Sequence, residues 1–170
     1  PCPCKIKHDE ERFDSQLIIS HHMQRDTLHA KLKDIYMNNR ERLDVAMAAD
    51  KICTAITNDE KVKGLYLYGP FGTGKSFILG AIANQLKSQK ISSTIVYLPE
   101  FIRTLKGGFK DGSFESKLQR VREANILMLD DIGAEEITPW ARDEVIGPLL
   151  HYRMVQELPT FFSSNLSFEE

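Results

Sequence analysis

Apolar residues occur in two alternating patterns along this chain, and each pattern predicts one kind of element. Short, almost continuous apolar runs, which are typical of buried β-strands, cover residues 64–68, 93–98, 125–131 and 160–165. Apolar residues at every third or fourth position, which are typical of amphipathic helices, cover residues 39–56, 74–90, 113–123 and 138–156. Strands that alternate with helices indicate an α/β fold with a mainly parallel sheet.

The stretch between the second and third predicted strands is less regular. Residues 100–105 have the apolar spacing of a short helix, and the pair Gly107 and Gly108 is expected to end it. Residues 107–112 are rich in glycine, so we expect them to form a flexible tip that becomes ordered on contact with a partner.

The length of the chain fits one domain. A chain of 170 residues can bury a substantial core. We expect residues 1–38 to form a lead-in segment and residues 39–170 to form the folded core. Because the chain starts with Pro1 rather than Met and stops directly after a predicted strand, we expect it to be part of a longer protein, with a core that is truncated at its C-terminal end.

The composition argues against several classes of protein. The net charge is −2, so the chain as a whole has no electrostatic attraction to nucleic acid or to a membrane surface. No apolar run approaches the roughly 18 residues that cross a bilayer, and the start has no signal-peptide pattern. Three cysteines are too few for a disulfide framework. These features predict a cytoplasmic protein without a membrane partner.

Residues 69–76 read Gly-Pro-Phe-Gly-Thr-Gly-Lys-Ser and fit the G-x-x-x-x-G-K-[ST] pattern of a phosphate-binding loop. The motif follows a predicted strand and precedes a predicted helix. Glycines let backbone N–H groups turn toward phosphates, and a helix N-terminus adds partial positive charge. We expect Lys75 to reach the β- and γ-phosphates of ATP and the Ser76 hydroxyl to bind Mg²⁺. The expected residues that bind ATP or ADP are Gly69, Pro70, Gly72, Thr73, Gly74, Lys75, Ser76 and Phe77.

Polar residues end the last two predicted strands. Asp130 and Asp131 end the third strand, and Asn165 ends the fourth. Asp130 has the position at which a phosphate-loop ATPase holds Mg²⁺, and Asp131 is placed to polarise the attacking water. A strand-end amide such as Asn165 is placed to orient that water by hydrogen bonding. We therefore expect the catalytic residues to be Lys75, Asp131 and Asn165.

Each of these motifs has a plainer alternative. Residues 69–76 fit a glycine-rich turn that binds nothing. Asp130 and Asp131 fit an ordinary solvated strand end, and Asn165 fits a turn-forming residue. The phosphate-loop pattern in its strand-to-helix context favours the nucleotide site.

Three motifs taken together resemble one family of ATPases. They are residues 69–76, residues 129–135 (Leu-Asp-Asp-Ile-Gly-Ala-Glu) and residues 163–165 (Ser-Ser-Asn). The resemblance is to the AAA+ ATPases, and among them to the bacterial replicative-helicase loaders of the DnaI and DnaC type. Transposition helper ATPases of the IstB type are close relatives of these loaders. The resemblance covers about residues 40–170.

The resemblance implies a fold and a division of roles. The fold is a P-loop NTPase of the AAA+, ASCE type, a three-layer α/β/α sandwich in which the Asp130 strand lies between the phosphate-loop strand and its neighbours. Asp130 serves the metal, Asp131 is the catalytic base and Asn165 is sensor 1. Such ATPases hydrolyse ATP to ADP and phosphate, and they complete the site with an arginine from an adjacent subunit and a sensor-2 arginine. Neither arginine is identifiable here, so we expect self-assembly through ATP-bridged interfaces and weak ATPase activity of this chain alone.

Residues 99–123 are the candidate DNA-binding segment. They interleave cations with phenylalanines, the combination that single-strand binders use for the backbone and the bases. The family resemblance implies that this region is the insert that contacts DNA. The alternative is a pair of amphipathic helices with core phenylalanines and solvated lysines. The candidate DNA contacts are Arg103, Lys106, Phe109 and Lys110.

The function implied by the resemblance is ATP-dependent loading of the hexameric replicative helicase onto single-stranded DNA, as part of a primosome. ATP and ADP states would act as a switch during replication initiation or restart. The main alternative is an IstB-type helper of a DNA transposase. A replication initiator would need a module that reads duplex DNA. A small-molecule kinase would need an acceptor pocket, whereas paired carboxylates beside an amide suit water activation better.

Overall fold

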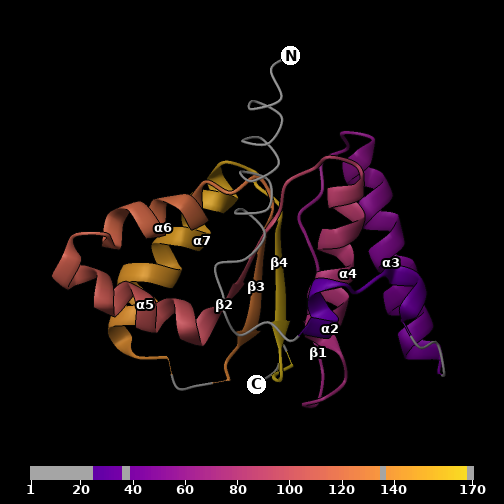
Figure 1. The fold of residues 1–170 in the computed structure, drawn as a ribbon, viewed down its shortest axis with the longest axis horizontal. Helices are drawn as coiled ribbons and strands as arrows, with labels where there is room; N and C mark the ends of the chain where they lie inside the picture. The colour runs from indigo at the N-terminus through magenta and orange to yellow at the C-terminus, as the bar shows by residue number, and fades with distance from the viewer. Residues whose placement is uncertain (1–24, 36–38, 135–136, 168–170) are drawn as a thin grey trace.

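The structure, a computed structural model, describes residues 25–35, 39–134 and 137–167. A parallel sheet of four strands, in the order β1-β4-β3-β2, lies at its centre (Figure 1). The strands predicted from the apolar runs are confirmed, with ends that differ by at most two residues from the expected ones. They are β1 (Tyr66–Tyr68), β2 (Thr94–Tyr97), β3 (Leu127–Ile132) and β4 (Thr160–Ser164).

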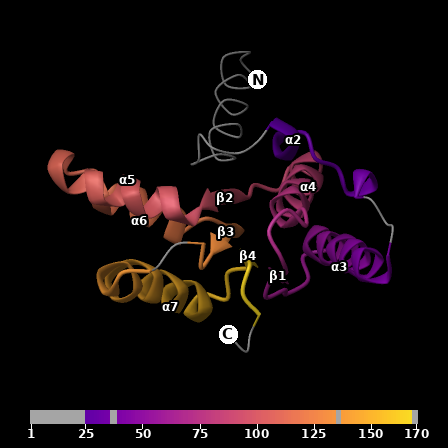
Figure 2. The same ribbon diagram turned by 90° about the horizontal axis from the view of Figure 1, so that it is seen from below.

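Helices cover both faces of the sheet, which confirms the three-layer α/β/α architecture (Figures 1 and 2). One layer consists of α2 (Arg25–Leu28), the 3-10 turn η1 (Leu32–Asp34), α3 (Arg40–Thr57) and α4 (Lys75–Ser88). The other consists of α5 (Leu98–Asp111), α6 (Phe114–Arg122), the π-helix η2 (Ala141–Ile146) and α7 (Gly147–Val155). None of the described helices is both long and apolar enough to cross a membrane.

The order of the strands places the Asp130 strand differently from our expectation. β4 pairs with β1 on one side and with β3 on the other, so β3 is not adjacent to the phosphate-loop strand. β3 instead lies between β4 and β2. Because all four strands are parallel, their carboxyl ends still meet at one edge of the sheet.

Helix α4 is the centre of its layer. It packs between the sheet and α3, and Leu79, Ile82 and Leu86 are fully buried there. The segment of residues 25–35 crosses α4 at Gly80, where a Cβ would lie 2.5 Å from the Thr27 carbonyl oxygen. Close packing on both sides therefore fixes the helix that begins at the phosphate loop.

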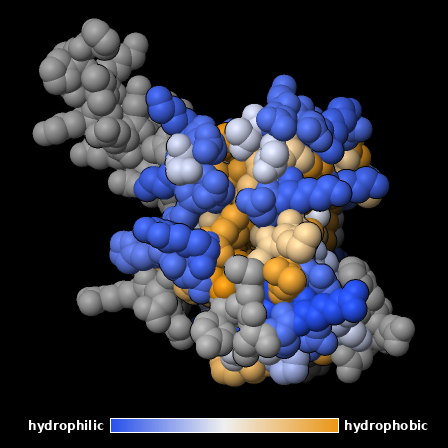
Figure 3. Space-filling model, turned by 90° about the vertical axis from the view of Figure 1, so that its right-hand side faces the viewer, coloured by the Kyte–Doolittle hydropathy of each residue, from blue (hydrophilic) through white to orange (hydrophobic). Residues whose placement is uncertain are grey.

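The outer surface of this layer is formed by α3. Asn39 caps the helix, because its side chain accepts a hydrogen bond from the Arg42 backbone N–H at 2.9 Å. Ala49 and Cys53 face the core, while Leu43 and Met47 stay exposed among polar neighbours. Figure 3 views this side of the molecule.

Our prediction for Gly107 and Gly108 is wrong, because α5 continues through both residues to Asp111. A Cβ on Gly108 would lie 3.0 Å from the backbone nitrogen of Phe114, so this glycine permits close contact between α5 and α6. The helix ends at Gly112, whose φ of 72° suits a glycine C-cap. The expected flexible tip over residues 107–112 is therefore mostly helix.

Candidate nucleotide-binding site

The predicted site residues meet at the carboxyl edge of the sheet. Lys75 and Ser76 begin α4, directly after the loop that follows β1. Asp130 and Asp131 lie in β3, and Asn165 directly follows β4. The central position of β4 in the sheet brings Asn165 between the loop and the two carboxylates.

The loop at residues 69–74 has the backbone that its glycines allow. Gly69, Gly72 and Gly74 have φ values of 145°, 77° and 88°, which residues with a Cβ rarely adopt. The Thr73 hydroxyl donates to the Pro70 carbonyl at 2.9 Å and holds the loop in a turn. Gly74 is the N-cap of α4, so the loop ends at a helix N-terminus, where backbone N–H groups and partial positive charge favour phosphate.

Lys75 is the central cation of the site. Its ammonium group donates to the carbonyls of Gly69 at 2.8 Å and Pro70 at 3.0 Å. It also donates to Asn165 Oδ1 at 2.8 Å. Partial burial lowers the pKa of Lys75, while the nearby charges of Asp131 and Asp130 act in the opposite direction. A phosphate at the loop would offer this ammonium group a stronger acceptor than the two neutral carbonyls.

Ser76 and Asp130 form the candidate metal site. The Ser76 hydroxyl donates to Asp130 Oδ1 at 2.9 Å, and Asp130 is only 6% exposed. A hydroxyl and a carboxylate are the oxygen donors that Mg²⁺ prefers. The described residues contain no group of three His, Cys, Asp or Glu side chains that could hold a metal ion. The pair therefore fits Mg²⁺ that takes its remaining ligands from nucleotide phosphates and water.

Asp131 and Asn165 are joined to each other and to the cation. Asn165 Nδ2 donates to Asp131 Oδ1 at 3.4 Å, while the amide oxygen of Asn165 accepts from Lys75. Burial raises the pKa of Asp131 and repulsion by Asp130 adds to this, whereas Lys75 lowers it. A carboxylate with a raised pKa is a better proton acceptor than a solvated aspartate, as a general base requires.

Two serines of β4 were missed by the sequence reasoning. The register between β3 and β4 shifts between Leu129 and Ile132, which marks a β-bulge at the two carboxylates. The Ser163 hydroxyl contacts both carboxylate residues across this bulge, and Ser164 donates to the Ile132 carbonyl at 2.7 Å. A pair of small polar residues at the end of an otherwise apolar strand marks the position in the sequence, but the contacts depend on the bulge.

A second missed contact comes from α3. The Arg42 guanidinium donates to the Thr73 carbonyl at 3.4 Å and connects α3 to the phosphate loop. Phe77, which we expected to contact nucleotide, is partly buried and packs its side chain against the core in the first turn of α4.

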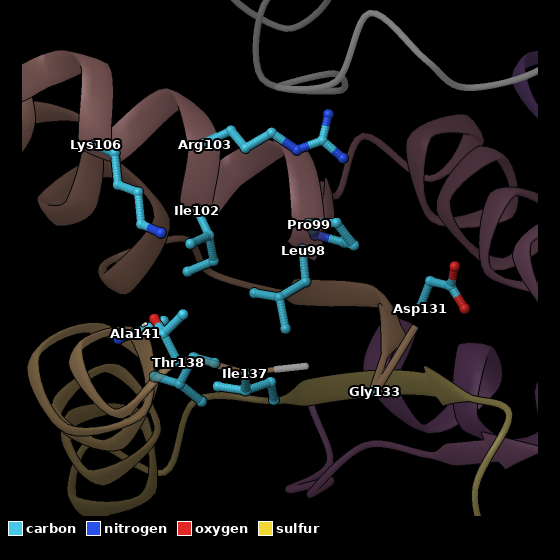
Figure 4. Close-up of a pocket in the computed structure, with 11 residues that line it drawn as sticks. Leu98, Pro99, Ile102, Arg103, Lys106, Asp131, Gly133, Ile137, Thr138 and Ala141 are labelled. Atoms are coloured by element: carbon cyan, nitrogen blue, oxygen red, sulfur yellow. Dashed lines mark hydrogen bonds between the residues drawn. The ribbon is translucent and has the colours of Figure 1, made fainter. Parts of the chain in front are cut away.

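A groove of about 140 Å³ adjoins the site on the α5 side (Figure 4). Its lining is mainly apolar and comes from α5, from the end of β3 and from the segment between β3 and α7. Arg103 and Lys106 extend from α5 along this groove, and Asp131 lies at the β3 end. The apolar lining residues are Leu98, Pro99, Ile102, Ile137, Ala141 and Ile146.

The candidate DNA contacts on α5 include exposed cations and an exposed aromatic ring. Arg103 and Lys106 are exposed, and Lys106 Nζ lies 5.6 Å from the centre of the Trp140 ring. Phe109 is 59% exposed and stacks on Phe114 with ring centres 4.5 Å apart. Lys110 lies in the last turn of α5.

A third phenylalanine of the segment, Phe101, is 2% exposed and belongs to the core. It is therefore not available to stack on a base. The structure combines our two interpretations of residues 99–123: an amphipathic helix pair that also carries an exposed surface of cations and one aromatic ring.

Comparisons with known proteins identify relatives along almost the whole chain. The model of a family described as IstB-like ATP binding protein matches residues 5–170. The replicative helicase loader DnaI of Bacillus subtilis is 47% identical over 169 residues, which cover 99% of this chain and 54% of that protein. The chain thus spans about half the length of this curated relative.

Solved structures agree with the fold. A crystal structure of DnaI superposes with a TM-score of 0.79 at 43% identity and covers 87% of this chain and 78% of that chain. The crystal structure of the DnaC helicase loader, at 24% identity, shares the fold with a TM-score of 0.75 over 85% of this chain and 81% of that chain. The resemblance to AAA+ loaders that the motifs indicated is confirmed, and the chain belongs to the family of IstB-like ATP-binding proteins.

Proposed function

We propose that this chain is the ATPase domain of a replicative helicase loader, which binds the hexameric helicase in one nucleotide state and releases it in the other. The observation that carries the proposal is the 47% identity to a protein named as a replicative helicase loader. This similarity favours a helicase over a transposase as the partner. The proposed place of action is the cytoplasm.

ATP and Mg²⁺ would occupy the loop and the adjoining carboxylate. The loop N–H groups and Lys75 hold the phosphates, and Ser76 and Asp130 hold the metal ion. The bound Mg²⁺ supplies positive charge beside the phosphates. Support comes from the family's ATP binding and from the Ser76–Asp130 pair of oxygen donors.

Hydrolysis would use the residues at the ends of β3 and β4. Asp131 accepts a proton from the attacking water, and Asn165 holds that water in place. Asn165 also contacts Lys75, so this amide is placed to respond to the phosphates that Lys75 holds. In this proposal the turnover of the chain alone is slow, because an arginine from a neighbouring subunit completes the site across an ATP-bridged interface.

The surface of α5 is the proposed contact for single-stranded DNA. Arg103 and Lys106 would bind the phosphates, together with Lys110, and the exposed ring of Phe109 would stack on a base. The groove beside these cations ends at Asp131, so DNA bound at this surface would lie next to the proposed nucleotide site.

Co-elution of the full-length protein with the replicative helicase of its organism tests the proposal. The experiment compares ATP, ADP and no nucleotide, with Lys75→Ala as the variant and Lys51→Ala, an exposed lysine of α3, as the matched control. We expect a complex whose stability depends on the nucleotide and loses that dependence only in Lys75→Ala. No complex under any condition would contradict the loader function and make a transposase the next partner to test.

A further inference from the structure

A buried serine connects the two carboxylate residues of the site. The Ser163 hydroxyl donates to Asp130 Oδ1 at 2.5 Å and accepts a hydrogen bond from the Asp131 backbone N–H at 2.8 Å. Ser163 is 1% exposed, so water does not compete for these bonds. The Ser163 hydroxyl thus contacts the side chain of Asp130, the proposed metal ligand, and the backbone N–H of Asp131, the proposed base.

The β-bulge explains why a side chain is needed at this point. From one paired position to the next, β3 advances from Leu129 to Ile132 while β4 advances only from Phe162 to Ser164. The extra residue in β3 interrupts the backbone ladder, and Asp131 adopts a left-handed φ of 64°. A buried N–H without a partner is costly, and the Ser163 hydroxyl supplies the missing acceptor.

The hydroxyls of Ser76 and Ser163 both donate to Asp130 Oδ1, but only that of Ser76 is also a proposed ligand of Mg²⁺. Ser76 donates to Asp130 Oδ1 at 2.9 Å, but its hydroxyl is also the proposed ligand of Mg²⁺. Ser163 lies on β4, and its hydroxyl is not a proposed ligand of Mg²⁺. Its bond to Asp130 therefore does not compete with metal binding.

We propose that Ser163 is a positioning residue that fixes Asp130 for Mg²⁺ and sets the place of Asp131 relative to it. The proposal rests on the proposed function, because it assumes that Mg²⁺ and nucleotide bind at this site. A charge-assisted hydrogen bond to a carboxylate is strong and directional. Without it, only Ser76 among the described residues, itself a proposed Mg²⁺ ligand, holds the Asp130 carboxylate, and the Asp131 N–H loses its acceptor.

The test measures the Mg²⁺ requirement of nucleotide binding rather than turnover. A fluorescent ADP analogue is titrated into the full-length protein at a series of Mg²⁺ concentrations and also in EDTA. We expect Ser163→Ala to raise the half-saturating Mg²⁺ concentration by roughly 10- to 100-fold, as the loss of a contact to a metal ligand does. Binding in EDTA should be the same as in the parent protein.

Ser164→Ala is the matched control, because Ser164 is an equally buried neighbour whose hydroxyl contacts only backbone groups. Both variants lose buried hydrogen bonds, so both are expected to lower the melting temperature. Only Ser163→Ala should change the Mg²⁺ requirement, and Ser163→Thr, which keeps the hydroxyl, should retain the parent value. An equal shift in both alanine variants, a shift in neither, or the same loss in Ser163→Thr would contradict the positioning role.

The parent protein separates this inference from the proposed function. If Mg²⁺ does not strengthen nucleotide binding by the parent, the proposed Mg²⁺–nucleotide site is wrong, and the role of Ser163 is wrong with it. If the parent depends on Mg²⁺ and Ser163→Ala depends on it equally, only the role of Ser163 is wrong.

Discussion

The carboxyl edge of the sheet and the outer surface of α5 carry the two halves of the proposed function, and they are built differently. At the sheet edge, hydrogen bonds join side chains from three elements, with Lys75 bound to Asn165 and Ser76 bound to Asp130. On α5, the cations Arg103 and Lys106 stand on one helix and are exposed. The first region is a partly buried network, whereas the second is an exposed surface.

This difference predicts how each region responds to substitution. A member of such a network positions its neighbours, so one change should remove most of an activity. Contacts on an exposed surface share the binding energy, so each change should remove a part of it.

The largest effect is expected from Asp131→Asn. The amide cannot accept the proton of the attacking water, so the rate of ATP hydrolysis should fall by roughly 10²- to 10⁴-fold. Phosphate release by the full-length protein is measured beside nucleotide affinity, which should be almost unchanged. Asp143→Asn, a change of an exposed aspartate in η2, is the control. Near-normal hydrolysis by Asp131→Asn would exclude this residue as the base.

Lys75→Ala should weaken nucleotide binding. The ammonium group is the side-chain cation closest to the proposed phosphates, and losing a charge-assisted hydrogen bond costs about 1.5–3 kcal/mol, or roughly 10- to 100-fold in affinity. Calorimetric titration with ADP and Mg²⁺ measures the effect, with Lys51→Ala as the control. If both variants bind like the parent, the loop does not use Lys75 for phosphate.

Arg103→Ala combined with Lys106→Ala should weaken single-stranded DNA binding several-fold. Each lost phosphate contact lowers the slope of log affinity against log salt by about 0.7. Fluorescence anisotropy over a salt series measures both quantities. A double alanine variant at Lys51 of α3 and Lys63 of the segment before β1, which are both exposed, controls for the change in net charge. Equal losses in the two double variants would show that the α5 surface is not a specific contact.

The two glycines of α5 should respond in opposite directions. A Cβ on Gly107 would meet nothing within 4 Å, so Gly107→Ala should stabilise the helix by about 0.5–1 kcal/mol. Gly108→Ala should destabilise the protein, because its Cβ would lie 3.0 Å from the Phe114 nitrogen. Denaturant unfolding of both variants measures the difference, and stabilisation by both would contradict the close approach of α5 and α6.

The smallest effect concerns the pH dependence of stability at the sheet edge. Because the folded pKa of Asp131 is raised above 3.8 by burial and by Asp130, the ionised carboxylate costs stability at neutral pH, and protonation relieves that cost. Asp131→Asn should therefore raise the melting temperature of the nucleotide-free protein at pH 7. The gain should shrink as the pH falls toward 3.8. A gain that grows on acidification would contradict the raised pKa.

The sequence predicted the sheet edge well because its motifs demand particular backbone geometry. Glycines at residues 69, 72 and 74 need positive φ, and Asp130 and Asn165 end strands whose carboxyl ends must meet in a parallel sheet. The role of Ser163 was not predictable, because it depends on the bulge between β3 and β4. Because β3 is buried on both faces and reads as a continuous apolar run, an extra residue at a bulge does not change its apolar pattern.

The α5 region was predicted less well, because its structure depends on packing rather than on a motif that demands particular backbone geometry. Two adjacent glycines usually break a helix, but here contact with Phe114 overrides their low helix propensity. Phe101 and Phe109 look alike in the sequence, yet one is buried and the other is largely exposed. Packing against α6 and the sheet decides which side of α5 faces the core, and charge and aromatic content do not reveal that packing.

The most direct test of the account is loading of the helicase onto a closed circle of single-stranded DNA. A closed hexameric ring cannot thread onto a circle unless a loader opens it or assembles it there. With ATP, the full-length protein should transfer the helicase of its organism to the circle, and Lys75→Ala should not. Transfer that is equally efficient without the protein, without ATP or with Lys75→Ala would contradict the proposal that this nucleotide site drives helicase loading.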